Sequence, residues 1–332
     1  MNIKKNFSLK FHNTFKINVK ANFFIEVFSK SDLFKIFDND ELVKMKKLIL
    51  GAGSNILFTK NFDGLILNIK IKGISEIREN FIKVYSGENW HKFVMWSLTN
   101  NYTGIENLSL IPGSVGAAPI QNIGAYGVEV KDVIYKVEVF NIYDKKIEVL
   151  DNSACKFKYR TSIFKNEFKE KYIIISVIFK LQRNGKLNLD YQELKNKLTN
   201  IINPTSINVS EAIISIRKNK LPDVNSIGNA GSFFKNPIIS KDDFKKLIKK
   251  FPSINFKIIN ANHVKISAGW LIESSGWKGY KKNNFGVYEK HALILVNFDD
   301  ASGFEINDLA NKIKNSVKDK FNINLDTEVN IL

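Results

Sequence analysis

The chain has 332 residues, 44% of them hydrophobic and 12% aromatic, which is enough apolar material for more than one domain with a packed core. Its single cysteine, Cys155, excludes a disulfide framework and a cysteine-based metal site, and a reducing compartment fits this composition. No run approaches the roughly 18 apolar residues of a membrane span, and the basic N-terminal segment lacks the apolar core of a signal peptide. We therefore expect a cytoplasmic protein with no membrane association and no metal.

The formal net charge of +17 raises nucleic acid as a partner. The chain is crowded with lysine, asparagine, isoleucine and phenylalanine, whereas its only arginines are Arg78, Arg160, Arg183 and Arg217. Such usage is typical of a coding bias toward AT-rich codons, and the lysines are scattered rather than gathered in arms or patches. We expect no nucleic-acid partner, and we regard an arginine in this chain as a better functional candidate than any one lysine.

The first half of the chain is rich in strand patterns. The predicted elements are a strand over 21–28, a short helix over 31–39, a strand, tight turn and strand over 47–59, strands over 64–70 and 81–87, a helix over 89–101, a hairpin over 133–150 and a strand over 171–182. Ser31 is the candidate N-cap of the first helix.

The second half mixes helices and strands. Helical spacing covers 206–222, 241–251, 267–277 and 305–321, a strand is predicted over 292–297, and the chain ends on a short strand within 325–332. The segment 228–234 is expected to be a loop. The pattern changes near residues 205–222, which we take as the boundary between the two halves.

Two glycine-containing loops lie in the first half. Gly51 and Gly53 follow an apolar strand, but Ile56 stands where a dinucleotide fingerprint has its third glycine, and a strand rather than a helix follows. This argues against a Rossmann domain.

The loop 107–127 contains more glycines and other small residues than the first loop. Its glycines and other small residues are Gly113, Ser114, Gly116, Ala117, Ala118, Gly124, Ala125 and Gly127. Side chains this small let several backbone N–H groups converge on an anion, so the loop favours a pyrophosphate cradle over simple turns. Two such loops indicate a large phosphate-bearing cofactor.

Ser232, in GNAGSFFKNP (228–237), has no clear role from local sequence. A nucleophilic serine needs a base, yet none of the histidines lies in a hydrolase motif, and Ala230 breaks the G-x-S-x-G elbow. The following Phe-Phe-Lys is not a Walker loop. Taken alone, the decapeptide indicates a glycine turn before a buried aromatic pair.

Several motifs nevertheless occur together and in order. They are GAGSN (51–55), IPGSVGAAPIQNIGAYG (111–127), YRTSIFK (159–165), RKNKLPD (217–223), GNAGSFFKNP (228–237), AGWLIESSGWKG (268–279) and the terminal TEV (327–329). The sequence closely resembles the UDP-N-acetylenolpyruvoylglucosamine reductase family over residues 20–330. Tyr191, in LDYQEL, matches the tyrosine segment of the longer branch of that family.

The resemblance implies an α+β protein with an FAD-binding fold of the vanillyl-alcohol-oxidase (PCMH) type in two subdomains, followed by a C-terminal α/β substrate-binding domain. The expected boundaries are 1–70 with 320–332 for the first subdomain, 71–215 for the second and 216–319 for the substrate domain. We identify no histidine in the position used for covalent flavin attachment, so a dissociable, noncovalent FAD and a monomeric protein are expected.

The implied reaction is NADPH-dependent reduction of UDP-N-acetylglucosamine enolpyruvate to UDP-N-acetylmuramate in peptidoglycan synthesis. Hydride addition beside a carboxylate develops enolate charge, which needs a cation, and a proton must reach the other carbon. Arg160 matches the family's catalytic arginine, Ser232 its proton donor and Glu328 its C-terminal glutamate. A planar guanidinium suits a carboxylate that becomes an enolate better than lysine would.

The remaining family positions concern binding. The implied substrate contacts are Tyr191, Lys220, Asn236 and His291. The implied cofactor contacts are Gly51, Gly53, Ser54, Asn55, Pro112, Gly113, Ser114, Gly116, Ala117, Gln121, Asn122, Gly124, Tyr126 and Arg217, the last of which serves either the flavin or the diphosphate.

Two departures from the family stand out. Glutamine is often found where this chain has His291, and arginine is often found two residues after the terminal glutamate, where this chain has Asn330. Neither removes a catalytic group.

Two other classes of protein stay open. Another FAD-dependent oxidase of the same superfold would explain only the glycine loops, and a nucleic-acid-binding protein would explain only the charge.

Overall fold

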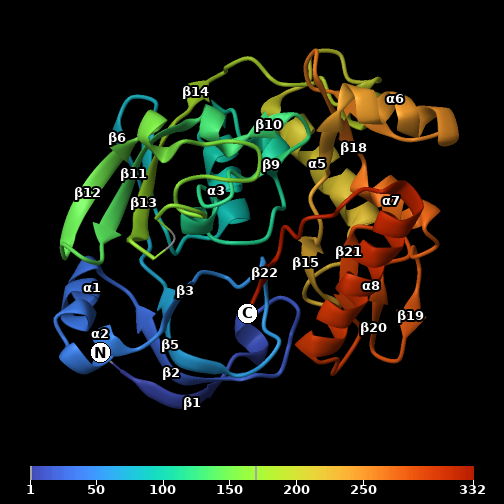
Figure 1. The fold of residues 1–332 in the computed structure, drawn as a ribbon. Coiled ribbons are helices and arrows are strands. Elements are labelled where there is room, and N and C mark those ends of the chain that lie inside the picture. The colour runs from blue at the N-terminus through green and yellow to red at the C-terminus, as the bar shows by residue number, and fades with distance from the viewer. Residues whose placement is uncertain (1, 169) are drawn as a thin grey trace. The chain divides into compact units, whose positions relative to one another are not determined.

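The computed structural model describes residues 2–168 and 170–332, and the chain forms two compact units (Figure 1). Unit 1 holds residues 2–7, Ala21–Ala52 and Asp63–Asn219. Unit 2 holds Ser8–Lys20, Gly53–Phe62 and Lys220–Leu332. Two short N-terminal segments therefore belong to the C-terminal unit. The expected division into two flavin subdomains and a substrate domain stays a prediction.

The first sheet of unit 1 has the strand order β1–β2–β5–β3. Its strands are β1 (Lys4–Ser8), β2 (Lys20–Val27), β5 (Phe62–Ile69) and β3 (Lys47–Leu50). β3 and β5 run parallel. Two short helices, α1 (Lys30–Phe37) and α2 (Asp40–Lys44), follow β2. Leu33, Ile36 and Phe37 of α1 pack with Leu65 and Leu67 of β5 in one buried core.

The N-cap of α1 is Ser29, so the prediction of Ser31 is wrong. The Ser29 hydroxyl accepts the backbone N–H of Asp32 (3.2 Å), and the Asp32 carboxylate accepts the backbone N–H of Ser29 (2.9 Å). This reciprocal capping box satisfies two N–H groups that the helix leaves unpaired, whereas Ser31 lies inside the helix.

The second sheet of unit 1 has the order β12–β11–β13–β7–β6. Its strands are β12 (Lys146–Asp151), β11 (Ile134–Asn141), β13 (Tyr172–Lys180), β7 (Phe81–Tyr85) and β6 (Ile74–Arg78). β11 and β12 pair antiparallel, which confirms the predicted hairpin. Helix α3 (Trp90–Thr99) is buried with this sheet, and the ring centroids of Phe93 and Phe179 lie 4.8 Å apart.

Shorter elements complete unit 1. They are β8 (Tyr102–Thr103), η2 (Glu106–Leu108), η3 (Val115–Ala117), β9 (Gly124–Ala125), β10 (Val128–Glu129), η4 (Val130–Asp132), η5 (Ser153–Cys155), β14 (Gln182–Arg183), α4 (Gln192–Leu198) and α5 (Ser206–Lys220). Helices α4 and α5 share a small apolar core in which Leu194 and Leu198 meet Val209 and Ile213.

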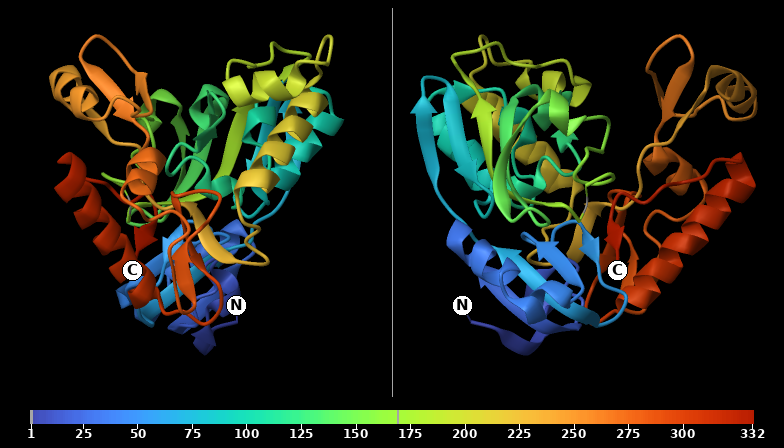
Figure 2. Two further views of the ribbon diagram at one scale, coloured as in Figure 1. Left: turned by 90° about the vertical axis from the view of Figure 1, so that its right-hand side faces the viewer. Right: turned by 60° about the vertical axis from the view of Figure 1, so that its left-hand side comes forward.

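Unit 2 contains a four-stranded sheet, a three-stranded sheet and a parallel strand pair. Its elements are η1 (Lys10–His12), β4 (Ile56–Leu57), β15 (Gly228–Ser232), β16 (Ile238–Ser240), α6 (Lys241–Lys250), β17 (Phe256–Ile258), β18 (His263–Ile266), α7 (Ala268–Ser274), β19 (Lys281–Lys282), β20 (Phe285–Val287), β21 (Ile294–Asn297), α8 (Gly303–Phe321) and β22 (Asn330–Ile331). The four-stranded sheet has the order β15–β21–β20–β19, whose strands are labelled in Figure 1. Helix α8, the long red helix in Figure 2, packs against β20 and β21.

The expected loop over 228–234 is largely a strand. β15 pairs antiparallel with β21, with an irregularity between Asn229 and Ser232 that absorbs Gly231 at a φ of +70°. The strand needs glycine at 228 because its backbone passes close to that of Phe15. A Cβ added to Gly228 would lie 2.4 Å from the Phe15 carbonyl oxygen. Gly228 therefore serves a close backbone approach, and Gly231 serves a left-handed conformation within the strand.

Gly303, the first residue of α8, tests how closely the segment 53–62 packs on that helix. A Cβ added to Gly303 would lie 1.8 Å from the carbonyl oxygen of Phe58, so backbone would have to move. We expect Gly303→Ala to lower the free energy of unfolding by about 2–3 kcal/mol, as overpacking does. Urea denaturation measures this.

The matched control is Gly269→Ala in α7, because its added Cβ would have no neighbour closer than 3.7 Å. This control should be neutral or stabilising by up to about 1 kcal/mol, since alanine is the better helix former. Equal losses in the two variants would contradict the packing argument.

Candidate active site

The glycine-rich loop lies against the end of β7 and the start of α3 in unit 1. The backbone N–H of Gly116 donates to the Ser86 carbonyl (3.0 Å), that of Val115 to the Glu88 carbonyl (2.9 Å), and that of Trp90 to the Gly113 carbonyl (3.0 Å). A Cβ added to Gly116 would lie 2.4 Å from the Cβ of Ser86. Glycine is therefore required at 116 by close backbone approach.

Two buried polar atoms beside these glycine turns have no hydrogen-bond partner among the described residues, the Ser86 hydroxyl and Oδ1 of Asn68. The Asn68 amide donates to the carbonyl of Gly51 (2.7 Å), and a Cβ added to Gly51 would lie 2.3 Å from the Ser114 hydroxyl. The turn at Gly51 and the loop at Ser114 are therefore neighbours. A surface of bare backbone with orphaned polar atoms fits a cofactor that brings phosphate, hydroxyl and amide groups.

The second glycine of GAGSN belongs to unit 2. Gly53 has a φ of +66°, and its added Cβ would lie 2.1 Å from the His12 carbonyl oxygen, so no other residue fits here without movement. The Asn55 carbonyl accepts from both the backbone N–H and the side-chain amide of Asn330, each at 3.1 Å. Asn330, which stands where the family often has arginine, is thus engaged in holding the C-terminal strand.

Arg160 is placed beside the glycine-rich loop. Its guanidinium donates from Nη2 to the Gly124 carbonyl (2.7 Å), and its φ of +55° lies in the left-handed region. The fully buried Asn122 fixes the same turn, because its amide donates to the Lys158 carbonyl (3.1 Å) and to the Glu129 carboxylate (2.9 Å). The predicted catalytic arginine and the predicted cofactor residues Asn122 and Gly124 are therefore brought together.

The hairpin β9–β10 presents Tyr126 at its tip. Tyr126 and Gly127 have φ values of +48° and +87°, the left-handed pair that a two-residue hairpin turn requires. The Tyr126 ring meets the ring of Tyr191 edge-on with centroids 5.0 Å apart. The Asn107 amide donates to the carbonyls of Tyr126 (3.0 Å) and Asn188 (2.9 Å), which joins the tyrosine segment to the hairpin.

Arg217 extends from α5 to the hydroxyl of Tyr126. Burial lowers the pKa of the Arg217 guanidinium, and the hydrogen bond that the guanidinium donates to the Tyr126 hydroxyl opposes that shift. The Nε atom of Arg217 is buried and has no hydrogen-bond partner within the described part of the chain. Burying a cation that has an unpaired N–H donor costs free energy unless an anion accepts from that donor. The geometry of Arg217 therefore fits a phosphate contact.

Ser232 and Glu328 lie on neighbouring segments of unit 2. Phe234 and Thr327 form an antiparallel bridge, the Glu328 N–H donates to the Phe233 carbonyl (2.8 Å), and the Lys235 N–H donates to the Asp326 carbonyl (2.9 Å). Phe233 and Phe234 are almost fully buried and anchor the segment, while Ser232 and Glu328 are half-buried. The structure thus brings a hydroxyl and a carboxylate into one short stretch of paired backbone.

The predicted substrate residues of unit 2 fall in two places. The Asn236 carboxamide accepts the backbone N–H of Ala268 (2.9 Å) at the start of α7. His291 lies near Lys220, and the pKa of its imidazole is lowered by burial and further by the charges of Lys220 and Lys278. The predicted site residues are therefore divided between the two units.

Sequence reasoning missed Ser86, Asn68 and Asn107, which position the glycine loop or leave orphaned atoms beside it. It also gave His91 no role, although the imidazole accepts a hydrogen bond from the backbone N–H of Leu110 (3.1 Å). Asn107 opens the glycine-rich stretch and could have been singled out on that ground. The others are distant in sequence from their partners.

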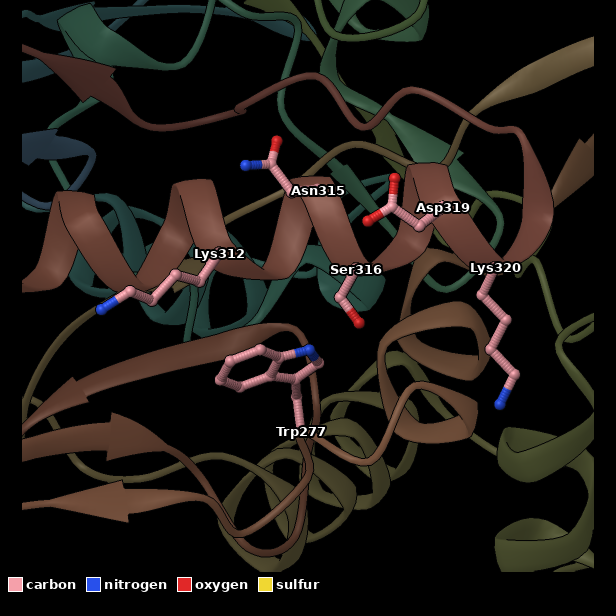
Figure 3. A pocket seen from close by; sticks show the side chains of 6 residues that line it. All are labelled: Trp277, Lys312, Asn315, Ser316, Asp319 and Lys320. Carbon is pink, nitrogen blue, oxygen red and sulfur yellow. The ribbon is translucent and has the colours of Figure 1, made fainter.

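A shallow groove in unit 2 contains none of the predicted residues. It is lined by Trp277, Lys312, Asn315, Ser316, Asp319 and Lys320. Figure 3 shows the Trp277 indole beside α8, which supplies the other lining residues. Over 2–168 and 170–332, no helix has the length and apolar character to cross a bilayer, and no three His, Cys, Asp or Glu side chains are grouped to hold a metal.

Comparison with known proteins defines first a class and then a family. A family model described as an FAD binding domain matches residues 38–150, and one described as the C-terminal domain of UDP-N-acetylenolpyruvoylglucosamine reductase matches residues 222–332. The chain thus joins a flavin-binding domain to a reductase C-terminal domain.

Full-length relatives identify the family. The UDP-N-acetylenolpyruvoylglucosamine reductases of Flavobacterium johnsoniae and Amoebophilus asiaticus are 45% and 42% identical, each with 100% of both chains covered. The chain belongs to the UDP-N-acetylenolpyruvoylglucosamine reductase family. The crystal structure of the Thermus caldophilus reductase shares its fold, with a TM-score of 0.70 at 21% identity over 100% of this chain and 99% of that one.

Asn122 provides a test of how the Arg160 turn is held. Asn122→Ala removes the amide that donates to Lys158 and Glu129 and the carbonyl that accepts from Lys131 (3.0 Å). We expect a loss of about 2–3 kcal/mol in the free energy of unfolding, because buried backbone groups are left unpaired. Chemical denaturation gives the value.

Asn166→Ala is the control, since this exposed amide bonds only the Thr161 hydroxyl among the contacts described (2.9 Å). Its effect should stay within about 0.5 kcal/mol. If Asn122→Ala is equally mild, the turn is not held by Asn122.

Proposed function

We propose that this chain catalyses the NADPH-dependent reduction of UDP-N-acetylglucosamine enolpyruvate to UDP-N-acetylmuramate with noncovalent FAD. The observation that carries the proposal is the pairing of the Ser232 and Glu328 segments in a chain whose other unit holds an FAD-binding domain with bare glycine turns. A proton donor and a carboxylate on paired backbone are what reduction of a polarised double bond requires.

The cofactor residues of the proposal are those whose surroundings fit a phosphate-bearing ligand. They are Gly51, Gly53, Ser54, Asn55, Pro112, Gly113, Ser114, Gly116, Ala117, Gln121, Asn122, Gly124, Tyr126 and Arg217. FAD, when bound, supplies hydride transfer from NADPH to the enolpyruvyl double bond. The glycine turns exclude side chains from the binding surface, and the buried Arg217 offers a donor to an anionic group.

Three side chains carry the remaining chemistry. Arg160 stabilises the negative charge that develops on the substrate carboxylate, because its planar fork binds two oxygens at once. Ser232 gives its Oγ proton to the carbon that does not receive the hydride. Glu328 polarises the intermediate or shares in that proton transfer. An alcohol can act as acid here because an enolate carbon is a strong base.

The substrate is held by Lys220, Asn236, His291 and Tyr191. Lys220 adds a cation for the diphosphate, and Asn236 is oriented by its bond to the start of α7. Tyr191 is an aromatic side chain that is 41% exposed, so it is accessible to a nucleotide. We further propose that the protein acts as a monomer in the cytoplasm, where NADPH and nucleotide sugars are available.

Ser232→Ala tests the proton-donor role. Loss of a positioned general acid should lower kcat by about a hundredfold to ten-thousandfold, while the FAD content stays at the wild-type level. Substrate-dependent NADPH oxidation at 340 nm and the flavin absorbance of the same sample provide both readouts.

Ser226→Ala is the matched control, because Ser226 is exposed and outside the proposed site. It should retain wild-type turnover. A Ser232→Ala protein with full turnover would remove the proton-donor role.

Arg160→Lys separates charge from geometry. Lysine keeps the positive charge but loses the bidentate fork and the bond to the Gly124 carbonyl. We expect kcat to fall by about a hundredfold with a smaller change in KM, since the lost interaction strengthens in the transition state. Steady-state kinetics measure both constants. A purely raised KM with unchanged kcat would assign Arg160 to substrate binding alone.

A further inference from the structure

The start of α3 holds the entry to the glycine-rich loop at several points. The Trp90 indole donates to the Leu108 carbonyl (2.9 Å), and the Trp90 backbone N–H donates to the Gly113 carbonyl (3.0 Å). Between these two ties, Nδ1 of His91 accepts the backbone N–H of Leu110 (3.1 Å). The loop entry is therefore fixed on α3 by consecutive residues.

Leu110 needs such a tie because its backbone is in the left-handed region, with a φ of +59°. A side chain with a Cβ adopts this conformation at a cost of about 1–2 kcal/mol, which other contacts must offset. Leu110 is followed directly by Ile111, Pro112 and Gly113, so its backbone direction decides where the cofactor-binding turn begins. The His91 hydrogen bond falls on the strained residue itself.

The bond depends on a neutral imidazole. Because Leu110 donates, Nδ1 must be unprotonated, and a doubly protonated ring could not accept. Burial lowers the pKa of His91, and the nearby cations Arg217 and Lys218 of α5 lower it further. The facing segment 107–113 has no ionisable side chain, and the neighbouring charge on α3 itself is the exposed Lys92. Both cations that act on His91 thus oppose its protonation.

We propose that His91 is a positioning residue of the flavin site, whose neutral imidazole holds Leu110 in its left-handed conformation and so sets the backbone of Pro112 to Gly116 for the cofactor. This inference rests on the proposed function, because that assigns Pro112 to Gly116 to FAD. His91 itself acts through the loop and touches neither cofactor nor substrate.

The test is the dissociation constant of FAD, measured by the quenching of flavin fluorescence on titrating apoprotein. His91→Ala removes the acceptor and should weaken FAD binding by about tenfold, the equivalent of one hydrogen bond of about 1.4 kcal/mol. His91→Asn should bind within about threefold of wild type, since its Oδ1 stands at the position of Nδ1 and can accept from Leu110. His263→Ala is the control, because His263 is exposed in unit 2 and its imidazole meets only the Asn260 side chain among the contacts described.

His91→Gln keeps the test decisive if the alanine variant fails to fold. Its amide lies one bond too far out to replace Nδ1, so it should bind FAD as poorly as the alanine variant. Wild-type affinity in His91→Ala or His91→Gln would overturn the inference, as would a loss in His91→Asn equal to that in His91→Ala. Wild-type protein that takes up no FAD would instead contradict the proposed function.

The pH dependence gives a readout that a packing role would not move. The folded-state pKa of His91 is depressed, so the imidazole stays neutral somewhat below its ordinary value and is protonated only as the pH falls further. Wild-type FAD affinity should therefore decline at pH values below about 6.5, and His91→Asn should lack that part of the decline. Identical pH profiles for wild type and His91→Asn would show that titration of His91 has no part in holding the loop.

Discussion

The candidate chemistry depends on one backbone contact, the antiparallel bridge between Phe234 and Thr327. It joins the segment that follows β15 to residues near the chain end, and the rings of Phe233 and Phe234 are buried against each other there. The last strand, β22, then pairs with β4. The C-terminus is thereby held in place, so that Glu328 bonds the backbone of Phe233, the residue that follows Ser232, although the two segments are remote in sequence.

In unit 1, glycines and buried asparagine amides hold the predicted site residues in place. The loop 107–127 approaches the end of β7 so closely that Gly116 cannot have a side chain. The Asn107 amide donates to the Tyr126 carbonyl of this loop, and the Asn122 amide donates to the Lys158 carbonyl beside Arg160. Arg160 is fixed by the same turns, and Arg217 is buried against Tyr126. A cationic, side-chain-free surface of this kind has an electrostatic cost in the free protein, which an anionic cofactor offsets.

Much of this arrangement could be predicted from sequence, because it follows from local patterns or ordered motifs. The hairpin over 133–150 and the helix over 89–101 are confirmed, since periodic apolar residues dominate their packing. Ser29 was missed as N-cap because the helix was predicted to begin at Ser31, whereas α1 begins at Lys30. The strand at 228–232 was read as a loop because Gly228 serves a close contact with the distant Phe15 and Gly231 an irregularity in the strand pairing. The role of His91 is equally non-local, since it depends on the φ of Leu110.

The most direct test of the proposed reductase is the stoichiometry of NADPH consumption by the FAD-loaded wild-type protein under nitrogen. The account predicts that NADPH oxidation begins only when UDP-N-acetylglucosamine enolpyruvate is added, stops when one equivalent has been consumed per substrate, and needs no oxygen. A protein whose bound flavin reacts with oxygen and ignores this substrate would be an oxidase that keeps the fold, and that result would contradict the account.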